Sequence, residues 1–112
     1  MRTMILGFAT LAILAASPAF AQDAALIEKG VQVYADQRCR LCHSIGDEGN
    51  SKGPLDDVGA RLSVEEITAW IEDSKGMTES TGAARKPAMK QFDLPDDEVE
   101  AVVAYLSSLK GS

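Results

Sequence analysis

Both cysteines and the only histidine of this 112-residue chain lie within five consecutive residues, Cys39-Arg40-Leu41-Cys42-His43. This cluster constrains the fold because the rest of the chain offers little material for a core. A domain of this size buries a modest share of its surface, so it often needs a covalent, metal or cofactor staple. From Gln22 onward the aromatic residues are only Tyr34, Trp70, Phe92 and Tyr105.

Two closely spaced cysteines suit several kinds of site. In an exported protein they could form a disulfide, whereas a thioredoxin-like redox pair requires a βαβ context that this sequence lacks. A structural zinc ion takes four protein ligands, but the two cysteines and one histidine supply three. The pattern C-x-x-C-H is the attachment signature of c-type haem, and we favour this interpretation over a disulfide.

The spacing of the motif meets the needs of haem attachment. On one helical turn, Cys39 and Cys42 present their thiols on the same side, where two thioether bonds to the porphyrin vinyl groups can form. His43 follows the second bond directly and is aimed at the iron as the proximal ligand. We therefore expect one haem c, covalent through Cys39 and Cys42, with His43 as a metal ligand.

An iron with six ligands needs a second axial donor, and the chain has no other histidine than His43. The candidates in the chain after the first 21 residues are Met77, Met89 or a lysine. Pro87 stiffens the backbone just before Met89, and the last predicted helix follows soon after and can hold this segment down. We expect Met89 to be the second metal ligand, while Met77 is better explained as a methionine that fills a gap in the core.

The amino terminus has the pattern of an export signal. Arg2 precedes 13 largely apolar residues from Met4 to Ala16, and Ala19-Phe20-Ala21 is an A-x-A cleavage site. A membrane-spanning helix needs roughly 20 apolar residues. We therefore predict a cleaved signal peptide over residues 1–21 and one domain over residues 22–112, located in the periplasm without a membrane anchor.

Apolar residues recur at helical spacing in three stretches of the predicted domain. The first runs from about Asp23 to Gln37. The second opens with a capping box of Ser63 and Glu66. Its apolar face carries Val64, Ile67, Trp70 and Ile71. The third ends at Gly111, and its apolar stripe carries Val99, Val102, Val103, Leu106 and Leu109.

Two long segments between these stretches, residues 43–62 and 74–91, are rich in Gly, Ser, Thr and Pro. Structureless loops of this length argue against an ordinary helical bundle unless the loops enclose something. The sequence therefore predicts an all-α fold, in which three main helices and long loops wrap around one covalently attached haem.

The chain carries 17 acidic and 11 basic residues, a net charge of −6 that becomes −7 when Arg2 leaves with the signal peptide. This balance argues against nucleic acid as a partner, because nucleic acid requires a basic face. Six basic residues nevertheless lie near the predicted haem site. These residues are Arg38, Arg40, Lys52, Arg85, Lys86 and Lys90. They form either a docking surface for an acidic redox partner or ordinary solvated charges.

The sequence resembles a known family, the class I monohaem cytochromes c, over nearly all of the chain after residue 21. Gly30 and Tyr34 resemble the family's small and aromatic pair on the first helix. Val102 and Tyr105 resemble the partners on the last helix, which cross that pair at close range because glycine lets two backbones approach. Phe92 is similar to the aromatic that follows the axial methionine, which implies a packing role.

Three further positions resemble the haem pocket of this family. The resemblance implies that the Pro54 carbonyl accepts a hydrogen bond from Nδ1 of His43, which orients the ring and raises its basicity toward iron. It also implies that Arg61 lies near a haem propionate and that Trp70 lines the haem. Taken singly, an arginine is more often a solvated surface residue and a tryptophan a plain core residue.

The resemblance implies a one-electron carrier and not an enzyme, because His43 and Met89 together leave no open iron position for a substrate. Its partners would be a redox protein donor and acceptor, with the chain a monomer or a subunit of a redox complex. Three alternatives stay open. They are a haem subunit of a dehydrogenase or oxidase complex, a gas-binding or peroxidase protein with an open sixth site, and a thiol protein without haem.

Overall fold

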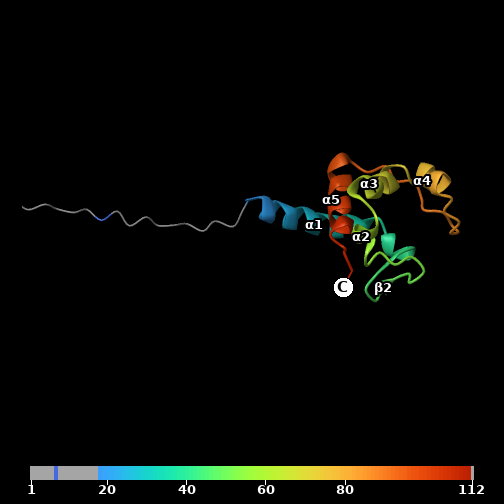
Figure 1. Cartoon of the computed structure of the whole chain (residues 1–112), viewed down its shortest axis with the longest axis horizontal. Coiled ribbons are helices and arrows are strands. Elements are labelled where there is room, and N and C mark those ends of the chain that lie inside the picture. Colours follow the sequence, from blue (N-terminus) through green and yellow to red (C-terminus); the bar gives the residue numbers. More distant parts are fainter. Residues whose placement is uncertain (1–6, 8–17, 112) are drawn as a thin grey trace, which may run out of the picture.

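A computed structural model describes residue 7 and residues 18–111, so residues 1–6 and 8–17 of the predicted signal peptide lie outside the described residues. The described part is mostly helical, which confirms the predicted all-α class (Figure 1). In chain order the elements are α1 (Pro18–Asp36), a 3-10 turn η1 (Cys39–Leu41), β1 (Ser44–Ile45), β2 (Glu48–Gly49), α2 (Val58–Arg61), α3 (Val64–Glu72), α4 (Ser74–Thr81) and α5 (Asp96–Ser107).

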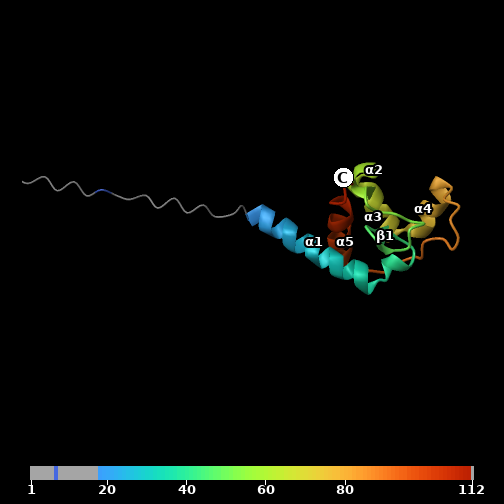
Figure 2. The same cartoon turned by 90° about the horizontal axis from the view of Figure 1, so that it is seen from below.

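The helix α5 lies at the centre of the fold and packs against both α1 and α3. The views in Figures 1 and 2 agree that α1 crosses α5 and that its N-terminal part extends away from the body. Within the described residues, no helix has both the length and the apolar character needed to cross a membrane. The buried core consists mainly of aliphatic residues from these three helices and α2: Val33, Val58, Ile67, Ile71, Val99, Val102, Val103 and Leu106.

The ends of the main helices differ from their predicted positions by a few residues. The helix α1 begins at Pro18 and not near Asp23, because proline suits the first helical position, where its missing N–H would have no partner. The capping box that begins α3 is confirmed by hydrogen bonds between Ser63 and Glu66 in both directions. Val64 does not join the buried face, since 54% of its surface is exposed.

The helix α5 starts after Pro95, which provides no side-chain cap. The Pro95 carbonyl instead accepts the backbone N–H groups of Glu98 and Val99. The helix ends at Ser107, so Leu109 lies beyond it, although its side chain still packs partly buried against the core. The carbonyl of Leu109 accepts the N–H of a glycine in α2, which fastens the end of the chain to that helix.

The segment 74–91, which we expected to be irregular, is helical in its first half. The side chain of Asp73 accepts the N–H of Gly76 and so begins α4, and Gly82 ends it with a positive φ of 68°. Hydroxyl groups inside α4 bond to carbonyls of the preceding turn, as those of Thr78 and Thr81 do. The high Ser, Thr and Gly content therefore misled the prediction, because these residues serve here as caps and backbone partners.

The segment 43–62 is also partly ordered. Two short antiparallel strands, β1 and β2, pair Ser44 with Gly49 and Ile45 with Glu48, and α2 adds one further turn. These elements are too short to show as a periodic apolar pattern, which explains why composition alone predicted a loop. The strand β2 lies against η1, so the hairpin that follows His43 packs beside the motif turn.

The crossing of α1 over α5 is the most extensive contact between two helices in the described part of the chain. A Cβ atom at Gly30 would collide with the Ala101 carbonyl and with the Cβ of Tyr105. The rings of Tyr34 and Tyr105 meet edge to face, with centroids 5.8 Å apart and planes at 76°. The predicted glycine and tyrosine pairing is therefore present, but the tightest approach is at Ala101 and not at Val102, which faces the core instead.

We expect Gly30→Ala to destabilise the protein by about 1–3 kcal/mol or more, because the added methyl group has no space at the crossing. Urea unfolding of the haem-loaded protein measures this loss. The matched control is Gln32→Ala, at an exposed position of the same helix, which should change stability by less than about 0.5 kcal/mol. Equal stability of the two variants would contradict the tight crossing.

Candidate haem site

The C-x-x-C-H segment forms a tight helical turn directly after α1. Arg38 adopts a left-handed conformation with φ of 57°, which ends the run of α1 and starts η1. The Cys39 carbonyl then accepts the N–H groups of both Cys42, at 3.1 Å, and His43, at 2.9 Å. Because of this single turn, both thiols and the imidazole face the same cavity.

Asn50 fastens this turn to the β1–β2 hairpin, a role that sequence reasoning missed. Its backbone N–H is shared between the carbonyls of Arg40 and His43, and its side-chain amide donates to the carbonyl of Leu41 at 3.1 Å. Three of the five carbonyls in the motif are thus held by one residue. An Asn next to a Gly was a turn signal in the sequence, but its contact with the motif depends on the folded chain.

The His43 ring is oriented by Gly53 and not by Pro54. Its Nδ1 lies 3.0 Å from the Gly53 carbonyl oxygen, so the expected acceptor is wrong by one residue. The reason is the parallel bridge beside β1, where Gly53 O accepts the N–H of Ser44 and the N–H of Leu55 donates to Ser44 O. In this extended segment successive carbonyls point to opposite sides. The carbonyl of Pro54 therefore faces away from the His43 ring.

A cavity of about 460 Å³ lies beside the motif. Its volume is within the range of about 300–1,000 Å³ typical of small-molecule and cofactor sites. Helices α3, α4 and α5, the motif turn and the loop after α4 contribute to its walls. All seven residues predicted to bind haem line it: Cys39, Cys42, His43, Pro54, Arg61, Trp70 and Met89.

Both methionines of the predicted domain reach this cavity. Met77 belongs to α4, whereas Met89 belongs to the loop between α4 and α5. Both side chains are partly buried, and Met89 also packs against the hydrophobic core. The structure therefore keeps Met89 available as a donor, and it places Met77 on the cavity wall and not in the closed core.

Arg61 and Trp70 reach the cavity from two different helices. Arg61 ends α2, and its Nε donates to the carboxylate of Asp57 at 2.8 Å in a pair that is half exposed. The remaining guanidinium donors are free to meet an anionic group. Trp70 belongs to α3, is partly buried and lines the cavity, so its position agrees with the cavity-lining role of the two roles that the sequence left open.

Burial shifts the proton equilibria of the groups at the cavity. It lowers the pKa of His43, with the positive charge of Arg85 acting in the same direction, and it raises the pKa of the Cys39 thiol. Burial also raises the pKa of Tyr34 to about 12. The imidazole is thus held neutral, which is the form that binds a metal.

These features fit a c-type haem. Cys39 and Cys42 are free thiols and not a disulfide, and the described residues hold no group of three or more His, Cys, Asp or Glu side chains suited to a metal ion. Tyr34 is among the residues that line the cavity. Its hydroxyl is buried and has no hydrogen-bond partner in the described part of the chain.

Comparison with known proteins agrees with this site. The sequence is 30% identical over 94 residues to cytochrome c oxidase subunit 2 of Alkalihalophilus pseudofirmus, a match that covers 76% of this chain and 26% of the relative. The chain thus spans about a quarter of that protein. No solved structure gives a significant match. A family model for cytochrome c matches residues 27–110, so the chain belongs to the cytochrome c family.

Proposed function

We propose that this protein carries single electrons between redox proteins outside the cytoplasm and does not act as an enzyme. One observation carries the proposal: the thiols of Cys39 and Cys42, the His43 ring and the Met89 thioether all line one cavity. A haem bound there takes up and gives back one electron at its iron. Haem-based electron transfer is also the function that the cytochrome c family supports.

We propose Nε2 of His43 and the sulfur of Met89 as the two metal ligands. The Gly53 carbonyl accepts a hydrogen bond from Nδ1–H, which leaves Nε2 as the ring nitrogen for the metal and fixes the ring plane. Two retained ligands exclude a substrate from the metal, and a soft thioether favours the reduced state. Both effects suit a carrier.

The proposal also places the protein in the periplasm, with residues 1–21 removed as a signal peptide. The support for this step is the sequence pattern of Arg2, the apolar run and the A-x-A site at Ala19-Phe20-Ala21. Its partners would then be a donor and an acceptor that are themselves redox proteins.

A second candidate function follows from the relative named above, which is a subunit of an oxidase. In this alternative the chain is a haem subunit of a larger redox complex. Co-purification with other subunits at a fixed stoichiometry would favour the complex, whereas isolation as a free monomer favours the diffusible carrier.

Covalent attachment is the first prediction of the proposed function. Haem should stay on the wild-type polypeptide after denaturation and reduction, since thioether bonds are not broken by either treatment. The double variant Cys39→Ala, Cys42→Ala should lose it, while each single variant keeps one bond. In-gel detection of haem checks this outcome, and haem that is extracted from the wild type would contradict the covalent site.

Axial ligation by Met89 is the second prediction. The reduced wild-type protein should resist carbon monoxide, because the gas must displace a ligand, and Met89→Ala should bind it readily. Met77→Ala is the matched control and should stay resistant, since Met77 is not the proposed ligand. Absorption spectra under carbon monoxide give the measurement. Rapid binding by the wild type would favour the open-site alternative.

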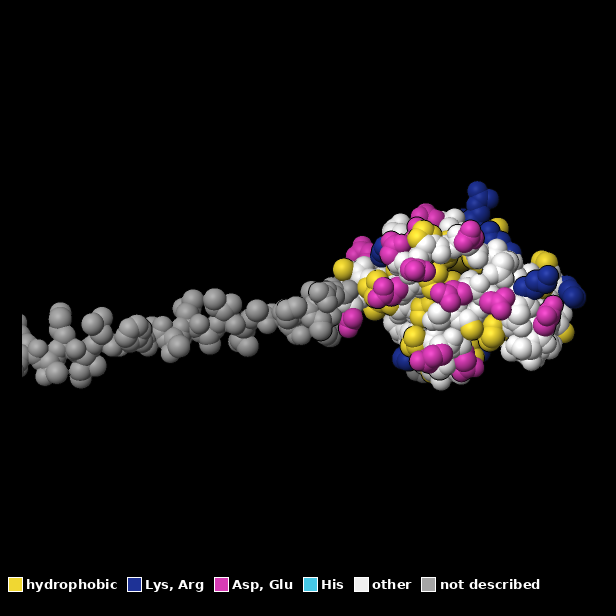
Figure 3. All heavy atoms as spheres, turned by 90° about the horizontal axis from the view of Figure 1, so that it is seen from above, with side chains coloured by type: hydrophobic (Ala, Val, Ile, Leu, Met, Phe, Trp, Pro, Cys, Tyr) yellow, Lys and Arg dark blue, Asp and Glu magenta, His cyan; other side chains and the backbone are white. Residues whose placement is uncertain are grey.

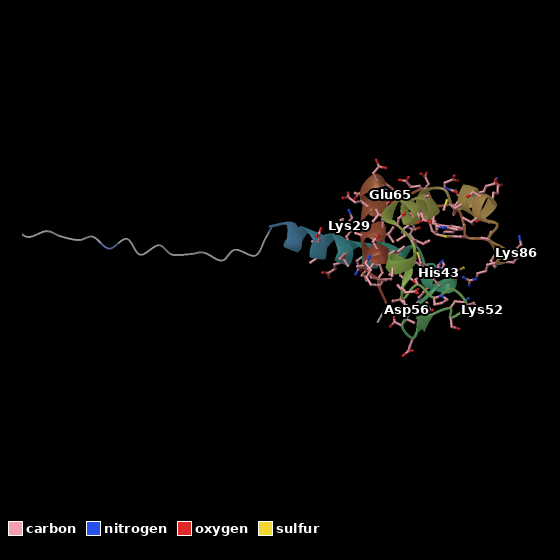
Figure 4. The ribbon with its side chains drawn as sticks, in the orientation of Figure 1. Lys29, His43, Lys52, Asp56, Glu65 and Lys86 are labelled. Atoms are coloured by element: carbon pink, nitrogen blue, oxygen red, sulfur yellow. The ribbon has the colours of Figure 1, made fainter. Side chains whose placement is uncertain are left out.

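Charge around the cavity favours an acidic redox partner. Figure 4 shows Lys52 and Lys86 at the end of the molecule where His43 lies, whereas Lys29 lies on α1, farther from His43. From above, Lys and Arg side chains gather mainly at the end away from α1, and acidic side chains spread over the rest (Figure 3). Leu41, within the attachment turn, is 64% exposed, so this end offers an apolar contact within a basic rim.

Electron transfer to an anionic oxidant should therefore slow as salt is added. The rate at which hexacyanoferrate(III) oxidises the reduced protein should fall between 0.01 M and 0.1 M ionic strength, as the screening length shortens from about 30 Å to about 10 Å. Lys86→Gln should lower the rate at low salt, whereas Lys29→Gln should not. Rates that stay flat or rise with salt would count against a basic docking surface.

A further inference from the structure

The chain that follows Met89 is tied to the start of α4 by Ser74. This serine is fully buried, with 0% of its surface exposed. Its hydroxyl donates to the carbonyl of Lys90, the next residue after Met89, at 2.7 Å. A buried hydroxyl costs free energy unless it is hydrogen-bonded, so this contact is specific and not incidental.

Gln91 adds two bonds at the same place. Its side-chain amide donates to the Glu72 carbonyl at 2.6 Å, and its amide oxygen accepts the N–H of Lys75 at 3.3 Å. The Gln91 side chain thus bridges the end of α3 and the start of α4. We call Ser74 and Gln91 together the loop clip.

The loop clip supplies the hydrogen bonds that hold the loop between α4 and α5 to the rest of the fold. From Ala84 to Leu94, a stretch that is wholly described, each hydrogen bond to another element involves either Ser74 or Gln91. The loop leaves α4 and returns to the body before α5 (Figure 1), and most of its residues before Met89 are exposed. Besides the clip, Met89 and Leu94 pack against the core, and the guanidinium of Arg85 lies close to Gly53.

We propose that Ser74 and Gln91 are positioning residues that hold the Met89 sulfur at the haem iron. This inference rests on the proposed function, in which Met89 is the second ligand. Because the clip fixes the residue next to Met89, it removes the freedom that the thioether would need to swing out of the cavity. Loss of the clip would remove the hydrogen bonds between this loop and the other elements and leave side-chain packing to hold it, so the ligand would leave the iron more often.

Carbon monoxide measures how often Met89 leaves, because the gas binds only where the thioether is absent. We expect Ser74→Ala to raise the apparent affinity of the reduced holoprotein for carbon monoxide about tenfold, the equivalent of about 1.4 kcal/mol, which lies within the net contribution of one hydrogen bond. Met89→Ala, which lacks the thioether altogether, gives the highest carbon monoxide affinity that the clip variants could reach.

Two controls separate positioning from general instability. Ser80→Ala removes a hydroxyl in the same helix that bonds within α4, and it should leave the affinity at the wild-type value. Val33→Ala weakens the core away from the cavity, so it should lower resistance to urea without raising the affinity. A rise with Val33→Ala as large as with Ser74→Ala would overturn the proposal.

Gln91→Ala keeps the test open if Ser74→Ala yields no holoprotein, because Gln91 is exposed and its loss should not prevent folding. It should raise the carbon monoxide affinity several-fold, in the same direction. If Ser74→Ala and Gln91→Ala have the wild-type affinity while Met89→Ala still binds carbon monoxide strongly, the positioning role of the loop clip is overturned and the ligand assignment of Met89 stands. Failure of Met89→Ala to bind would instead overturn the ligand assignment beneath it.

Discussion

The fold depends on the contact between α1 and α5 at Gly30. The motif turn follows α1 after Asp36 with a single left-handed residue, Arg38, at its start. Whatever fixes the direction of α1 therefore also fixes where the thiols of Cys39 and Cys42 point. Without a side chain at Gly30, the backbone of α1 comes against the Ala101 carbonyl. A looser crossing would move the whole attachment turn.

The second constraint is that the His43 ring must be neutral and must point in one direction. Burial lowers its pKa, and the Gly53 carbonyl determines which nitrogen carries the proton. A Cβ at Gly53 would collide with the carbonyl of Cys42 and with Arg85. The backbone at Gly53 can therefore approach the ring only because the residue has no side chain. The orientation of the ligand is thus a property of main-chain packing.

The sequence predicted the parts that depend on local chemistry. The C-x-x-C-H turn and the capping box of Ser63 follow from spacing along the chain, and the structure has both. The pairing of Tyr34 with Tyr105, which the structure also has, was implied by the resemblance to the family. It did not predict contacts between distant segments, such as Asn50 with the motif or Gly53 with the ring. In these contacts a backbone atom is one partner, and a backbone atom carries no sequence signal.

The two methionines illustrate the same limit and show what decides between them. Both Met77 and Met89 reach the cavity, so position alone does not choose a ligand. Met77 moves with α4, and Met89 moves with its loop. Ser74 is the first residue of α4 and also bonds to the chain beside Met89, so the helix and the loop are fastened at one point. A change at Ser74 would therefore act on the segment that carries Met89, while Met77 stays on α4.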